Sequence, residues 1–165
     1  MTSFIAVVTG ASWFGYLARA VLTFMFWASG LAKLIDFQGG MAEMAQFGLQ
    51  PAAAFNIAVI ITQLCGSALI IANRWTWLGA GWLAIFTALT IPIVHTFWKM
   101  EEPFKTMEFY VVMEHISIVG GLMVVAWKSW ATSLSQRQSA HASVGLGGSA
   151  PDMVAPPRRR FEAND

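Results

Sequence analysis

The sequence predicts an all-α protein, an integral membrane four-helix bundle with short loops and a disordered C-terminal tail. Of the 165 residues, 56% are hydrophobic and only 12% are charged, and soluble domains carry roughly twice that share of charge. Four apolar stretches of about 20 residues each follow one another, which is the length that crosses a bilayer. After Lys128 the composition changes to Ser, Gly, Gln and Pro. We therefore predict a membrane domain over residues 1–130 and a tail over residues 131–165.

The first predicted span covers residues 16–34. A cation stands near each end of an uncharged run, and the distance between them is about 21 Å along a helix. Residues at four-three spacing share one helix face, and this face carries Arg19, Thr23, Phe26, Gly30 and Lys33. Because it holds both charges and the one glycine, we expect it to point at other helices. The alternative is a plain anchor with flanking charges.

The segments on either side of this span are less regular. The N-terminal residues lack the basic start and the clear cleavage site of a signal peptide, so we expect an uncleaved apolar lead-in. After the span, residues 41–47 predict a short amphipathic turn that lies on the membrane. Pro51 then precedes the second span.

The remaining spans are predicted at residues 52–72, 78–98 and 109–127. The link NRWTW between the second and third spans is very short, which makes these two helices antiparallel neighbours. Pro92 removes one backbone donor and predicts a kink in the third span. Small residues suited to packing between helices are Gly66, Ser67, Gly120 and Gly121.

Charges and tryptophans give a predicted orientation. Four spans put both termini on one side, and the basic residues of the two sides are tied until the tail arginines are counted. Basic loops favour the cytoplasm, so we predict cytoplasmic termini in a bacterial plasma (inner) membrane. Five tryptophans mark the interface on the terminal side: Trp13, Trp75, Trp77, Trp127 and Trp130.

Composition also excludes several classes of function. A net charge of +1 argues against a nucleic-acid partner. Cys65 is the single cysteine, so neither an internal disulfide nor a CxxC redox pair can form. Any electron transfer therefore needs a borrowed cofactor. We predict no metal site.

Polar residues inside apolar spans are the candidate functional residues, because an unpaired polar group in hydrocarbon is costly. Those expected to bind a ligand are Lys33, Asp36, Asn56, Gln63, His95, Glu114 and His115. Several of them lie at similar depth in the predicted outer half. A carboxylate beside an imidazole can pass protons, and a nearby lysine can stabilise negative charge. Glu114, His115 and His95 are therefore the catalytic candidates for a small polar or quinone-like ligand.

The same residues allow a purely structural interpretation. Polar side chains on neighbouring membrane helices often bond to one another and hold the bundle together. A haem held by His95 and His115 is conceivable on facing helices, but two histidines about one turn apart in depth are weak support, and haem is not expected.

The first span also resembles a known family. Arg19 followed by FMFWASGLAKLIDF resembles the first-helix signature of the DoxX family, an arginine and then F-x-x-SG-x-x-K. The resemblance extends over residues 17–127. It includes GLQP at 48–51, Gly66, Ser67, Arg74 and HTFW at 95–98. The sequence departs from the family in having Gln63 in place of Glu, and Glu114 and His115 in place of a Lys-Asn pair.

The resemblance implies a four-helix membrane protein with a redox association. Some DoxX-like and DoxD-like members are tied to quinone reduction, or to membrane complexes that handle oxidative stress. We expect a membrane subunit or anchor of such a system, with lipid, a soluble oxidoreductase or other membrane subunits as partners. It would be at most an oxidoreductase subunit, and quinone is the cofactor that this interpretation allows. The alternative is a non-enzymatic carrier of small solutes or an assembly scaffold.

Overall fold

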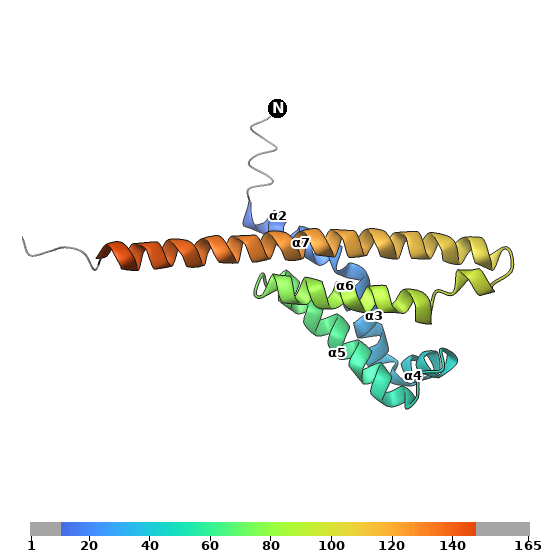
Figure 1. Ribbon diagram of the computed structural model, residues 1–165. Coiled ribbons are helices and arrows are strands. Elements are labelled where there is room, and N and C mark those ends of the chain that lie inside the picture. The colour runs from blue at the N-terminus through green and yellow to red at the C-terminus, as the bar shows by residue number, and fades with distance from the viewer. Residues whose placement is uncertain (1–10, 148–165) are drawn as a thin grey trace, which may run out of the picture. The chain divides into compact units, whose positions relative to one another are not determined.

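The computed structural model describes residues 11–147, and within that range the chain is helical with no strand (Figure 1). Three helices are long and apolar enough to cross a membrane, and a bent pair makes a fourth span if it counts as one. This confirms the all-helical membrane class. The elements are α2 (Ser12–Leu22), α3 (Phe24–Ile35), α4 (Phe37–Gln46), α5 (Ala52–Ile71), α6 (Thr76–Ile93), a 3₁₀ turn (Phe97–Lys99) and α7 (Phe104–Gly147).

The first predicted span is not one continuous helix. It divides at Thr23 into α2 and α3, whose axes bend by 63°. The Thr23 hydroxyl donates to the Arg19 carbonyl oxygen at 2.8 Å. A hydroxyl that bonds back to the preceding turn competes with the backbone ladder and bends helices, which the four-three spacing alone does not reveal.

The predicted packing face of this span does point inward. Thr23, Phe26 and Gly30 are buried. A Cβ atom at Gly30 would lie 2.9 Å from Leu64 Cδ2 on α5, so glycine allows the two helices to approach closely. At the other end Arg19 Nε donates to the Ile71 carbonyl oxygen at 3.4 Å.

Helix α4 extends over ten residues, where the sequence predicted only a short turn at 41–47. Asp36 is its N-cap, and its carboxylate accepts from Gly39 N at 2.9 Å. Helix α5 agrees closely with the predicted second span. Its buried stripe meets α3, α4 and α6, which makes α5 the central helix of this group.

Helices α5 and α6 are antiparallel neighbours, as the short link predicted (Figure 1). They touch through glycines: a Cβ atom at Gly66 would lie 2.7 Å from Leu83 Cγ, and one at Gly79 would lie 2.8 Å from the Gly66 carbonyl oxygen. Helix α6 ends at Ile93, so Pro92 lies in its last turn instead of kinking a longer span. Proline lacks the backbone N–H that would bond to the Ala88 carbonyl oxygen, but the ladder continues past it, because Val94 N donates to the Thr90 carbonyl oxygen at 2.7 Å.

Helix α7 differs most from the prediction. It begins at Phe104, five residues before the predicted span, and continues through Gly147, where a disordered tail was expected from residue 131. Between Lys128 and Val144 the sequence has neither Gly nor Pro, so nothing in it stops a helix. Residues 148–165 of the predicted tail and residues 1–10 of the predicted lead-in lie outside the described range. The chain divides after Ala131 into two compact units.

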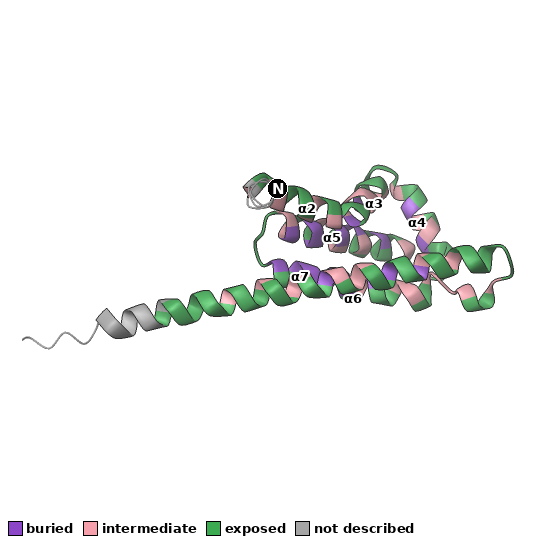
Figure 2. Ribbon diagram, turned by 90° about the horizontal axis from the view of Figure 1, so that it is seen from above, coloured by how far each residue is buried: buried purple, intermediate pink, exposed green. Residues whose placement is uncertain are grey.

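The core of the first unit lies where α3, α5, α6 and α7 meet (Figure 2). Its fully buried side chains include Phe26, Ile70, Leu83 and Leu122, one from each helix. Many large apolar side chains on the outer faces of the same helices are exposed. This distribution is what a bilayer requires, because lipid covers those outer faces.

Candidate functional site

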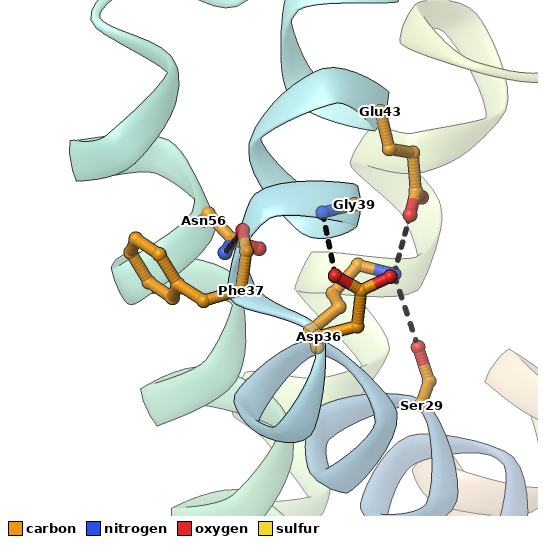
Figure 3. A network of polar contacts seen from close by, with 7 residues as sticks. Ser29, Asp36, Phe37, Gly39, Glu43 and Asn56 are labelled. Atoms are coloured by element: carbon orange, nitrogen blue, oxygen red, sulfur yellow. Dashed lines mark hydrogen bonds and ion pairs between the residues drawn. The ribbon is translucent and has the colours of Figure 1, made fainter.

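One polar network joins α3, α4 and α5 (Figure 3). The Lys33 ammonium lies 2.7 Å from a carboxylate oxygen of Glu43 on α4. It also donates to Ser29 Oγ at 3.4 Å, one turn earlier on α3. The Lys33 side chain is only 14% exposed, whereas that of Glu43 is 43% exposed. The ion pair therefore holds α4 against the end of α3 at a partly open edge.

The remaining groups of this network hold the turn between α3 and α4. Asp36 caps α4, and Asn56 on α5 donates from Nδ2 to the Phe37 carbonyl oxygen at 3.3 Å (Figure 3). Asn56 is fully buried. We name Ser29, Lys33, Asp36, Glu43 and Asn56 the rim network. Apart from one oxygen of Asn56, its contacts bind the protein to itself.

A second polar cluster lies where the segment after α6 meets α7. His95 Nδ1 lies 2.8 Å from Glu108 Oε2. The ring of His95 lies against that of His115, with centroids 4.5 Å apart and planes tilted by 56°. We name Glu108, His95 and His115 the imidazole cluster. It places a carboxylate and two imidazoles in one continuous row.

Hydrogen bonding fixes the proton positions in this row. His115 Nδ1 lies 2.8 Å from the Val111 carbonyl oxygen. A carbonyl can only accept, so Nδ1 carries the hydrogen and Nε2 is the acceptor in the neutral ring. By the same argument an ionised Glu108 accepts from His95 Nδ1. Each imidazole thus keeps its Nε2 for a further proton or ligand.

The row leads from the surface inward. Glu108 lines an open hollow of ≈ 380 Å³ together with Met100, Glu101, Phe104 and Met107. His95 is partly exposed, and His115 is only 7% exposed. The two adjacent rings thus connect the hollow to the interior of the helix group.

Helix α5 adds three buried acceptors to the interior. Asn56 Oδ1, Gln63 Oε1 and Ser67 Oγ have no hydrogen-bond partner within the described part of the chain. All three are buried, and their spacing of seven and four residues places them on one face of the helix. Buried polar groups without a partner are uncommon, so this stripe offers sites for water or for a ligand that donates hydrogen bonds.

The predicted outer cluster therefore separates into two groups. Lys33, Asp36 and Asn56 belong to the rim network, while His95 and His115 belong to the imidazole cluster. In the structure Glu114 pairs with neither Lys33 nor His95. Lys33 pairs with Glu43, His95 pairs with Glu108, and Glu114 is exposed on the outer side of α7.

Sequence reasoning missed Ser29 of the rim network and two acidic residues of these groups, Glu43 and Glu108. Glu43 stands in the segment predicted as a short turn on the membrane, and Glu108 stands between the third and fourth predicted spans. The available signal for Glu108 was its place one residue before the predicted fourth span, within reach of the other polar groups at that end.

The two glycines predicted to pack on the fourth span differ in their surroundings. A Cβ atom at Gly121 would lie 3.6 Å from Leu22 Cδ1 on α2, which is an ordinary packing distance. A Cβ atom at Gly120 would meet nothing within 4 Å, so this glycine faces open space. Only Gly121 therefore contributes to packing within the described residues.

Comparison with known proteins identifies the chain at the family level. The model of the family described as DoxX matches residues 15–96, which is about half of the chain, from α2 to just past His95. No curated protein matches the chain, and no solved structure does. In the part of the chain that the structure describes, no three His, Cys, Asp or Glu side chains form a metal-binding group. The signature around Arg19 and Lys33 lies within the matched residues, and the chain belongs to the DoxX family.

Proposed function

We propose that this protein is the membrane subunit of a redox system and that its imidazole cluster exchanges protons with a quinone-like molecule. The observation that carries the proposal is the row from Glu108 through His95 to the buried His115. Imidazole is the side chain that exchanges protons most readily near neutral pH. The Glu108 carboxylate at one end of the row orients the His95 ring through its contact with Nδ1.

The chemistry divides between this chain and a partner. Reduction of a quinone to a quinol consumes electrons and an equal number of protons. Cys65 is the single cysteine, so the chain has no dithiol of its own to supply the electrons. A soluble oxidoreductase or another membrane subunit would supply the electrons, and the Glu108–His95–His115 row would supply the protons.

The same proposal includes a bacterial plasma membrane and cytoplasmic termini. The ring centroids of Trp77 at the start of α6 and Trp130 within α7 lie 5.2 Å apart, which supports one aromatic belt at this level of the two helices. A reporter fused after Lys128 should then be active in the cytoplasm, and one inserted at Met100 should be active outside. The reverse pattern would contradict this orientation.

Quinone binding tests the proposal directly. The purified protein in lipid nanodiscs is titrated with decylubiquinone, and quenching of its tryptophan fluorescence is recorded. Wild type should bind saturably, and His115→Leu should weaken binding about tenfold or more, because a buried polar partner of the ligand is lost. Lys33→Met is the matched control and should bind like wild type. Equal quenching by all three proteins would overturn the proposal.

The buried acceptors of α5 favour a second candidate, a carrier of small solutes. Asn56, Gln63 and Ser67 each keep an oxygen in the interior that has no partner among the described residues. A carrier would show uptake of a small hydrogen-bond donor, such as glycerol or urea, into proteoliposomes, and Gln63→Leu would abolish that uptake. Uptake that is the same with and without the protein would remove this candidate.

A further inference from the structure

Glu114 occupies a position that the proposed function does not use. It stands next to His115 in α7, but His115 is buried and Glu114 is exposed. Counted from Phe109, where the apolar segment begins, Glu114 lies about 8 Å inside the membrane. Its carboxylate therefore faces the region that lipid tails would fill around the isolated protein.

No group in the described residues 11–147 compensates this carboxylate. The ion pairs of Lys33 and His95 go to Glu43 and Glu108, and within the same residues the Glu114 side chain makes no hydrogen bond. Ser117, on the same face, satisfies its own hydroxyl by donating to the Met113 carbonyl oxygen at 3.0 Å. An acidic side chain within a span is rare and marks a functional contact.

The face around Glu114 suits close contact with another helix. Glu114, Ser117, Gly120 and Val124 follow the three-three-four spacing of one helix side, and all four are exposed. We name them the Glu114 face. Because a Cβ atom at Gly120 would meet nothing within 4 Å, a neighbouring backbone can approach there, as small residues allow in membranes.

We propose that the Glu114 face binds a transmembrane helix of a different membrane protein, which presents a basic side chain to Glu114. Charge complementarity selects this partner over a second copy. In a two-fold pair each copy offers the same patch, so Glu114 would face Glu114. The two cations of the first span are already engaged, Arg19 with Ile71 and Lys33 with Glu43, and Lys99 and Lys105 stand before the apolar segment that holds Glu114.

The inference goes beyond the proposed function, and the two can fail separately. Glu114 and His115 are consecutive in α7, so their side chains point in directions about 100° apart, one exposed and one buried. A variant at Glu114 should therefore leave decylubiquinone quenching in nanodiscs unchanged. Loss of quinone binding in His115→Leu would say nothing about the partner helix.

Photocrosslinking in the cells that make the protein tests this contact. A photoreactive amino acid is placed at Ser117, and the crosslinked peptide is identified by mass spectrometry. We expect an adduct with a membrane span of another protein that contains Arg, Lys or His. The control position is Ile85 on the outer side of α6, which is 64% exposed and should not give the same adduct.

Charge variants complete the test. Glu114→Leu suits an apolar span, so folding is not at risk, and it should lower the adduct yield about tenfold or more, since one member of a desolvated charge pair is missing. Glu114→Lys should abolish the adduct, and exchanging the partner's basic residue for Glu should restore it. Adducts with lipid alone, with a second copy, or with undiminished yield in Glu114→Leu would each overturn the proposal.

Discussion

The rim network and the imidazole cluster use similar residues for different ends. Both contain a carboxylate and a basic side chain, joined at 2.7 Å in Lys33–Glu43 and at 2.8 Å in His95–Glu108. In the rim network the contacts run among α3, α4 and α5 and fix the turn between them. In the imidazole cluster each ring keeps one nitrogen that the described residues do not use.

Under the function proposed above, the difference gives a criterion for telling structural polar groups from functional ones in a membrane protein. Burial alone does not separate them, because Asn56 in the first group is more buried than His115 in the second. A better criterion is whether a titratable side chain keeps a donor or acceptor atom that no other group in the protein uses. This distinction leads to four predictions, from the largest expected effect to the smallest.

The largest effect is expected in the imidazole cluster. His95→Gln and Glu108→Gln should each lower quinone-linked activity of membranes about 10- to 100-fold, near the range for loss of a general acid or base. Residues that act as one unit are not additive, so the double variant should be no worse than His95→Gln alone. Effects that multiply would show that the two residues act independently.

A stability loss without loss of function is expected in the rim network. A Cβ atom at Gly40 would lie 2.5 Å from Asn56 Oδ1, so Gly40→Ala must displace Asn56 and weaken its bond to Phe37. The expected cost is about 1–3 kcal/mol, the range for overpacking. Thermal unfolding in detergent measures it, and Gly81→Ala, where a Cβ meets nothing within 4 Å, is the control.

A smaller effect is expected for the ion pair of the rim network. Lys33→Met should cost no more than about 1 kcal/mol, because Glu43 is 43% exposed and solvent screens the pair. A double-mutant cycle with Glu43→Gln measures the coupling. Quinone binding should not change. A loss of quinone binding in Lys33→Met would show that this lysine belongs to the binding site. The distinction between the rim network and the imidazole cluster would then be wrong.

The smallest effect is expected at the C-terminal end. Deletion of residues 139–165 should shift the unfolding free energy of the membrane domain by less than about 0.5 kcal/mol, the usual range for surface changes. Residues 134–139 are exposed, and the chain divides into units already at Ala131. A large drop in melting temperature would show that the end of the chain supports the bundle.

Sequence periodicity predicted the spans well because a bilayer leaves few choices. Helix α5 agrees with its prediction within a residue or two, and its polar residues Asn56, Gln63 and Ser67 are all buried. The bend at Thr23 was not predicted, because it depends on where one hydroxyl finds a carbonyl. Helix over residues 132–147 was not predicted either, because a polar composition is typical of disorder, although the segment holds no helix breaker before Gly145.

The interaction partners of the polar side chains were harder to predict than the depth of these side chains in the membrane. His95, His115 and Glu114 do lie toward one end of the bundle, but depth does not say on which side of a helix a residue stands. The choice of His115 over its neighbour Glu114 as the inward residue depends on the packing of α7 against α6. A single sequence does not encode that packing in its spacing.

The glycine contact between α5 and α6 also has a consequence for biosynthesis. A short link and two backbones that touch at Gly66 and Gly79 let these helices associate as soon as both have entered the membrane. Helix α7 is made last of the described spans, and it brings Glu108 and His115. The nascent chain therefore forms the α5–α6 hairpin before the Glu108–His95–His115 row exists. His95 contacts Glu108 and His115 only after the final span has been synthesised.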